Sequence, residues 1–234
     1  MAAPPAAQPD VRLEVVDDPS AFYGAADDGV NSAQTVIANA FGHQIRDAVW
    51  RGLNPGWETP EGAKASAVRN VQRWKSISTD KDGRPNTIFL VATVPGDDRE
   101  STGEGEGGGD SYKTGRRIVG FAIWAQISMV PGYGDPVYAD IRNVDGKGFD
   151  LAKALFPNNE REQRYMGQAF ASLLKRRASL VREKAAAFER GELRQGEKPA
   201  SFHLDLCVVD PAWQRRGIAQ KLVGWGLEEA KRRG

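Results

Sequence analysis

The sequence has one cysteine and no long apolar run, and each scarcity excludes a class of protein. A single thiol, Cys207, cannot form an internal disulfide and cannot build a cysteine-based zinc site. No stretch approaches the roughly 18 apolar residues that a membrane-spanning helix requires. Residues 1–9, rich in Ala and Pro, lack the basic start and apolar run of a signal peptide. We therefore expect a soluble cytoplasmic protein with no membrane partner.

An excess of charge of one sign is also missing. Lys and Arg total 32 against 31 Asp and Glu, a net charge of +1, so the balance does not point to nucleic acid as a partner. There is no P-loop Lys-Ser/Thr pair and no Rossmann glycine pattern, which disfavours ATP and NAD. Residues 80–83 (Asp-Lys-Asp-Gly) resemble the start of a calcium loop but lack its remaining ligands. We expect a turn there and no metal site.

With 40% hydrophobic and 27% charged residues, the composition is that of an ordinary globular protein. After a tail at residues 1–10, residues 11–234 read as a single α/β (α+β) domain, a mostly antiparallel sheet flanked by helices. Residues 95–117, rich in Gly, Asp, Glu and Ser, predict a flexible loop between two antiparallel strands. Periodicity predicts strands at 11–15, 87–94, 118–127 and 202–209, and helices at 31–41, 44–53 and 60–76.

Residues 128–199 read as an insertion, irregular at first and then helical. The helix is predicted over 158–190, with Asn158 or Asn159 as its cap and Gly191 as its stop. Its basic run at 175–177 fits a solvated face better than a steering site for an anion. Two aromatic residues have two open readings, as lining of an acceptor pocket or as ordinary core: Trp124 and Tyr133.

The segment from 202 to 234 carries the most chemical information. A strand ends at residues 210–211 (Asp-Pro), a short loop follows, and an amphipathic helix begins directly behind it. Strict alternation places Leu204, Leu206 and Val208 on one face of the strand. It places His203, Asp205, Cys207 and Val209 on the other face.

Such a strand–loop–helix junction is suited to an anion. The first turn of a helix has unpaired N–H groups and the positive end of the helix dipole. Gly217 lets a phosphate approach the backbone closely, and Arg215 and Arg216 add positive charge. A diphosphate is therefore a physically reasonable ligand, although a single glycine beside two arginines is a weak signal by itself.

The segment resembles motif A of the GNAT superfamily of acyl-CoA N-acyltransferases, which reads Q/R-x-x-G-x-G/A. Gln214, Gly217 and Ala219 occupy its three defining positions. The resemblance covers about the last 30 residues, 202–234, and is only architectural before them. It implies acetyl-CoA as cosubstrate, in a GNAT-like fold. That fold continues past the motif helix with further strands; the sequence stops at Gly234, so we expect these C-terminal strands to be missing and the chain to be a fragment.

The resemblance also implies roles for individual residues. The strand would pair with the pantetheine arm through Cys207, Val208 and Val209. The loop would hold the pyrophosphate, with contacts from the following residues: Gln214, Arg215, Arg216, Gly217, Ile218 and Ala219.

Transfer of an acetyl group from a thioester to a primary amine requires alignment of the two groups and removal of a proton. His203 lies where several enzymes of this family place a general base, and Asp205 could orient it. The competing reading of His203 is a polar residue at a strand end. Cys207 is interpreted as a small core residue rather than a nucleophile, since no base is positioned to activate it.

Three functions therefore remain open. The chain is an N-acetyltransferase for a small-molecule or protein amine, a coenzyme A-binding module without catalysis, or an interaction protein whose long helix docks a partner.

Overall fold

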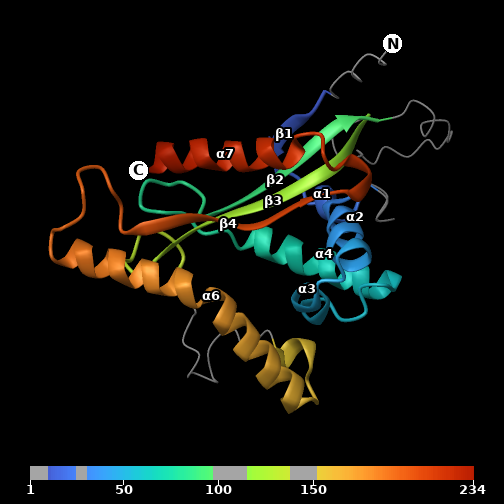
Figure 1. Ribbon diagram of the computed structural model, residues 1–234, viewed down its shortest axis with the longest axis horizontal. Helices are drawn as coiled ribbons and strands as arrows, with labels where there is room; N and C mark the ends of the chain where they lie inside the picture. The colour runs from blue at the N-terminus through green and yellow to red at the C-terminus, as the bar shows by residue number, and fades with distance from the viewer. Residues whose placement is uncertain (1–9, 25–30, 97–114, 138–151) are drawn as a thin grey trace, which may run out of the picture.

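The computed structural model describes residues 10–24, 31–96, 115–137 and 152–234. The predicted tail at 1–10 and the predicted loop at 95–117 fall almost entirely outside these ranges. Within them, a mixed α/β architecture is built on a four-stranded sheet in which every neighbouring pair is antiparallel (Figure 1). The sheet follows chain order: β1 (Arg12–Val15), β2 (Thr87–Pro95), β3 (Arg116–Ser128) and β4 (Ala200–Val209).

The two central strands are covered on both faces. All residues of β2 from Thr87 to Val94 are buried, which explains why this strand is a continuous apolar run rather than an alternating one. Phe89 and Val91 belong to the core on one face, and Ile88 and Leu90 belong to the core on the other. The predicted antiparallel pairing of the strands at 87–94 and 118–127 is confirmed.

The first of these cores is closed by short helices from the N-terminal part of the chain. They are α1 (Ser20–Tyr23), α2 (Ala33–Ile37), the π-helix η1 (Ala38–Gln44), α3 (Ala48–Leu53) and α4 (Pro60–Lys75). Side chains cap three of them, since Ser32, Asp47 and Thr59 each accept a hydrogen bond from the first turn that follows. The helix predicted to start at 44 begins four residues later because Arg46 has a positive φ of 56°, which interrupts helical winding.

The second core is closed by α7 (Ile218–Arg233), which runs along the opposite face of the sheet (Figure 1). Ile218 and Leu222 of α7 are buried there against the sheet. Gly226 brings the helix so close that a Cβ at this position would lie 1.9 Å from Cε2 of Trp124. Trp124 also stacks on Phe202, so the core reading of this tryptophan is the correct one.

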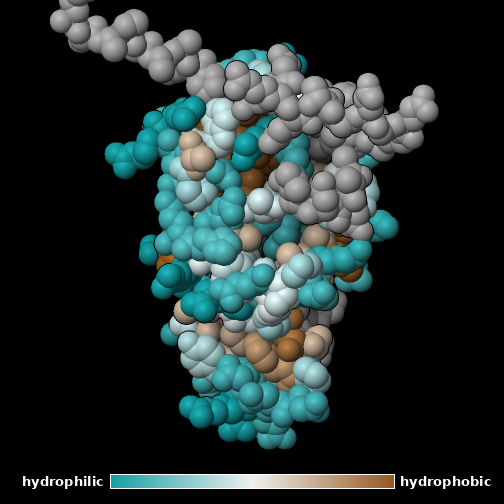
Figure 2. Space-filling view, turned by 90° about the vertical axis from the view of Figure 1, so that its right-hand side faces the viewer, coloured by the Kyte–Doolittle hydropathy of each residue, from teal (hydrophilic) through white to brown (hydrophobic). Residues whose placement is uncertain are grey.

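The helix predicted at 158–190 is α6 (Glu160–Glu189), capped by Asn159, whose side chain accepts from the N–H of Glu162. It packs on β3, β4 and α3, and its N-terminal half extends beyond the sheet (Figure 1). Several large apolar side chains of α6 are exposed, among them Tyr165 and Leu173. Hydrophobic residues also gather in the lower part of the face in Figure 2, surrounded by hydrophilic ones.

No helix within the described ranges is long and apolar enough to cross a membrane.

The alternation expected for β4 is wrong in one respect. Leu206 pairs with Ile123 and Leu204 pairs with Trp124, so Asp205 is an extra residue in the strand, a β-bulge. A bulge reverses the facing of every side chain beyond it. Leu206 therefore packs in the core beneath α1 and α2, whereas Leu204 packs with Cys207 in the core beneath α7.

The residues at 80–83 form a turn, as predicted. Oδ1 of Asp80 accepts from the backbone N–H groups of Asp82 and Arg84, and Oδ2 accepts from Arg84 and Gln126. These bonds occupy the carboxylate that a cation would need. Among the described residues there is no cluster of three His, Cys, Asp or Glu placed to hold a metal ion.

Candidate functional site

The loop between β4 and α7 is held to the rest of the protein by two side chains. Gln214 donates from Nε2 to the carbonyl of Val209 at 3.1 Å and to Oε1 of Gln44 at 2.8 Å. Asp210 accepts from the backbone N–H of Ala212 at 2.9 Å and from Asn39 at 2.9 Å. Gln214 therefore fixes the loop, and its side chain is occupied by protein groups.

The turn into α7 has an unusual backbone. Gly217 lies at φ +77° and Arg215 at φ +65°, both in the left-handed region. A Cβ at Gly217 would meet only Oε1 of Gln220, at 3.6 Å, so the space above this residue is open. None of the described side chains caps α7, in contrast to α2, α3, α4 and α6. The N–H groups of a first helical turn have no intrahelical acceptor. Without a capping side chain, those of α7 suit an anion.

A cavity of about 510 Å³ lies at this turn, between the end of β4 and the start of α7. We call it the loop cavity. Arg216 is the one residue of the predicted coenzyme set outside its lining: the guanidinium lies 4.6 Å from the ring centre of Trp213 and donates to the carbonyl of Ala212. The other predicted residues all line it: Cys207, Val208, Val209, Gln214, Arg215, Gly217, Ile218 and Ala219.

A second cavity of about 620 Å³ lies between β4 and the helices of the first core. We call it the helical cavity. Residues of α2, η1, α3, α4 and α6 contribute to its wall, together with β3 and β4. Much of this wall is aromatic or aliphatic, including Phe41, Trp50, Phe170, Leu174 and Leu206. An organic molecule with an apolar body fits such a surface.

Cys207 lies on the wall of both cavities. It sits on β4, the edge strand of the described sheet, whose outer backbone groups have no strand partner within the described ranges. Burial raises the pKa of the Cys207 thiol, which disfavours the thiolate form at neutral pH. The two cavities thus adjoin at one point of an edge strand.

His203 and Asp205 lie on the same side of β4, as predicted, with Nε2 of His203 3.9 Å from Oδ1 of Asp205. Only Asp205 lines the helical cavity; His203 lines neither cavity. Asp205 accepts from Arg73 of α4 at 2.8 Å and from Arg177 of α6 at 3.1 Å. The bulge at Asp205 therefore joins two helices to the strand.

Burial and ion pairing set the ionisation of both groups. Burial, and then the positive charge of Arg177, lowers the pKa of His203 from 6.5 to about 4, so its imidazole is neutral at pH 7. Burial opposes ionisation of Asp205, but the charge and hydrogen bond of Arg73, with Arg177, outweigh it, and its pKa lies below its ordinary value. Asp205 is therefore a carboxylate at pH 7. Nδ1 of His203 has no hydrogen-bond partner among the described residues.

No known protein family and no curated protein matches this sequence. Among solved structures, the chain is similar to the crystal structure of mosquito arylalkylamine N-acetyltransferase like 5b. The identity is 12% and the TM-score 0.43, over 96% of this chain and 73% of that chain.

Sequence reasoning missed the polar residues that α2 and α4 bring to the helical cavity, notably Gln34 and Arg73. No local motif marks them. The basic run at 175–177 was predicted to be a solvated face. In the structure, Arg177 from this run lines the helical cavity and pairs with Asp205. Tyr133 does not reach the helical cavity, because its hydroxyl bonds Lys81 and its ring packs on Phe188.

Proposed function

We propose that this protein is an N-acetyltransferase that binds acetyl-CoA in the loop cavity and acetylates a primary amine held in the helical cavity. The observation that carries the proposal is the meeting of the two cavities at Cys207, on an edge strand. One cavity has an uncapped helix N-terminus for a diphosphate, and the other has an apolar wall for an organic acceptor. The resemblance of the loop to motif A of the GNAT superfamily supports the same assignment.

In this proposal the backbone N–H groups of Gly217, Ile218 and Ala219 bind the pyrophosphate, and Arg215 adds positive charge. The outer edge of β4 at Cys207–Val209 pairs with the pantetheine arm. Arg216 stays outside the loop cavity, because its guanidinium is engaged with Trp213. The open space above Gly217 leaves room for a phosphate against the backbone.

The reaction forms one bond and breaks one. The neutral amine attacks the thioester carbonyl carbon, a C–N bond forms, and the C–S bond breaks. Coenzyme A leaves as a thiolate and takes up a proton. The proton lost by the amine passes to His203. Because Asp205 lies on the cavity wall and His203 does not, this transfer runs through a bridging water beside Asp205. A neutral His203 can accept a proton, but with a pKa of about 4 it holds that proton weakly and passes it on to solvent.

Calorimetric titration with acetyl-CoA tests the coenzyme site. We expect the unmodified protein to bind and Gly217→Glu to lose at least about tenfold in affinity, because the new carboxylate occupies the anion position. Gly191→Glu is the matched control, since Gly191 also has a positive φ, of 70°, and open surroundings. A folded protein that binds no acetyl-CoA would contradict the proposal, and equal binding by Gly217→Glu would remove the loop assignment. Amine-dependent release of the free coenzyme A thiol then tests transfer.

A second candidate function is coenzyme A binding without catalysis. It is favoured by one observation, that His203 lines neither cavity. Tight binding of acetyl-CoA, with no thiol release for any amine tested, would select this candidate.

A further inference from the structure

The wall of the helical cavity is largely apolar, and its polar side chains have more unpaired hydrogen-bond donors than unpaired acceptors. Its charged residues are Arg73, Arg177, Asp205 and Asp47. Formal charge is balanced among these four, but hydrogen-bonding capacity is not. The difference lies in which of these groups already have partners inside the protein.

Three of the four oxygens of the two carboxylates accept from protein donors. Oδ1 of Asp47 accepts from the backbone N–H of Trp50 at 2.6 Å, as the cap of α3. Asp205 uses one oxygen for Arg73 and the other for Arg177. Each arginine donates to Asp205 through a single Nη, and neither makes another side-chain hydrogen bond within the described part of the chain. Most guanidinium N–H groups of the two arginines therefore have no partner among the described residues.

A third donor points to the same chemistry. Gln34 is only 6% exposed and lies between the helical cavity and a neighbouring cavity of about 410 Å³. Its Nε2 has no hydrogen-bond partner among the described residues. Its Oε1 accepts weakly, at 3.4 Å, from Asn70, one turn before Arg73 on α4. A buried donor without an acceptor is costly, and a ligand oxygen would satisfy it.

From this surplus of donors we infer that the acceptor is an amine that also carries a carboxylate, such as an amino acid with an apolar or aromatic side chain. The carboxylate accepts from the arginines and Gln34, and the apolar body lies against Phe41, Trp50 and Phe170. Arginine is well suited to this role because its planar fork matches a carboxylate. The inference rests on the proposed transferase function and names the substrate class for the same site.

The test compares matched amines that differ only in the carboxylate: alanine with ethylamine, leucine with isopentylamine, and phenylalanine with 2-phenylethylamine. We expect kcat/KM to favour the amino acid by about tenfold or more in at least one pair. Arg177→Gln should abolish that preference, whereas Arg176→Gln, an exposed neighbour on α6, should preserve it. The ratio within a pair is the readout, because a purely structural defect lowers both members equally.

Gln34→Leu is a second variant, useful if loss of Arg177 unfolds the protein, because Gln34 forms no ion pair. It should lower the ratio in the same direction. A preference for the plain amine in every pair, or a ratio unchanged in both Arg177→Gln and Gln34→Leu, would overturn the inference.

Calorimetry separates this inference from the proposed function. N-acetylphenylalanine and N-acetyl-2-phenylethylamine are titrated into the protein without coenzyme. Binding that requires both the carboxylate and Arg177 supports the inference, even if acetyl-CoA does not bind. Failure of acetyl-CoA to bind removes only the transferase proposal. Equal binding of the two compounds, in a protein that binds acetyl-CoA, removes the inference alone.

Discussion

At the scale of single residues, the environment of His203 is decided by what surrounds β4. Its side chain is 14% exposed, lies 3.9 Å from Asp205, and is close enough to Arg177 and Arg73 for both to disfavour its cationic form. The bulge at Asp205 holds the intervening carboxylate between the two arginines. The histidine is therefore kept neutral at pH 7.

The lowered pKa of His203 predicts a loss of stability in mild acid. Between pH 6.5 and about 4, the unfolded chain binds a proton at this histidine while the folded protein does not. The free energy of unfolding should therefore fall by up to about 3 kcal/mol from this group as the pH drops through that window. Urea denaturation at several pH values measures the slope, which should be shallower in His203→Gln. Identical slopes in the two proteins would show that His203 titrates normally.

At the scale of elements, the first turn and the middle of α7 serve two different purposes. Its first turn, beginning after Gly217, forms part of the loop cavity. Its middle is set against the sheet at Gly226, where the ring of Trp124 lies directly over the helix backbone. Close contact in the middle therefore determines where the N-terminal N–H groups lie relative to β4.

Two glycines of α7 give a matched pair for testing this contact. Gly226→Ala places a methyl group within 1.9–2.5 Å of three Trp124 ring atoms and should destabilise the protein by about 1–3 kcal/mol. Gly224→Ala meets nothing within 4 Å and should stabilise it by roughly 0.5–1 kcal/mol through helix propensity. Urea denaturation measures both changes. If both variants behave alike, the helix is not seated on Trp124.

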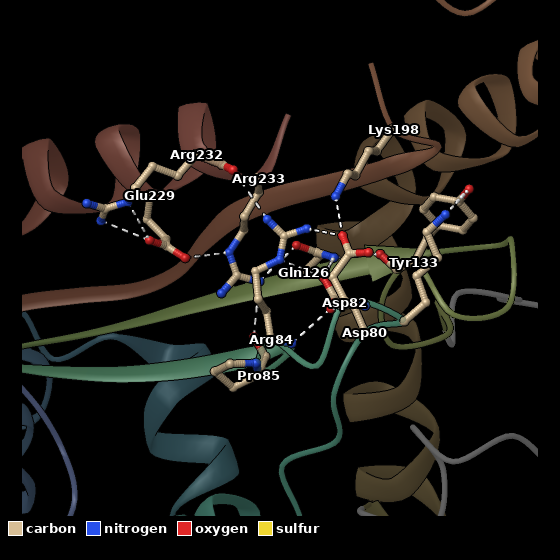
Figure 3. Close-up of polar contacts among 11 residues, drawn as sticks. Asp80, Asp82, Arg84, Pro85, Gln126, Tyr133, Lys198, Glu229, Arg232 and Arg233 are labelled. Carbon is tan, nitrogen blue, oxygen red and sulfur yellow. Dashed lines mark hydrogen bonds and ion pairs between the residues drawn. The ribbon is translucent and has the colours of Figure 1, made fainter. Parts of the chain in front are cut away.

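At the scale of the whole molecule, a polar cluster joins the last turn of α7 to the sheet and its loops (Figure 3). Arg233 is 4% exposed, and its guanidinium donates to Glu229, to the carbonyl of Pro85 and to Gln126. Nearby, Lys198 pairs with Asp82 across a long sequence separation. The cluster therefore connects the segment before β2, strand β3, the segment before β4 and α7 at one end of the molecule.

Neighbouring arginines at the end of α7 should differ sharply in their contribution to stability. Arg233→Ala removes the donor to the carbonyl of Pro85 and to Oε1 of Gln126, while Glu229 keeps Arg232, and should lower the free energy of unfolding by about 1–3 kcal/mol. Arg232→Ala removes an ion pair to the same Glu229, but the Arg232 side chain is 63% exposed and the loss should stay below about 1 kcal/mol. Chemical denaturation of the two variants provides the comparison, and losses of equal size would contradict the assignment.

Local patterns in the sequence were sufficient for most elements of this fold. The long helix, its Asn159 cap, and the strands at β2 and β3 follow from periodicity and capping residues, which are properties of neighbouring positions. The strand–loop–helix motif with Gly217 followed in the same way, because an anion site at a helix start is built from consecutive residues.

The tertiary structure alone decided the environment of the chemical groups. The extra residue at Asp205 depends on cross-strand pairing with β3, which no local pattern specifies. Asp205 meets Arg73 from 132 positions away and Arg177 from 28 positions away. The helical cavity likewise exists only where five helical segments and two strands converge. Periodicity describes neighbours along the chain, whereas the charge and shape of a site depend on residues that become neighbours only after packing.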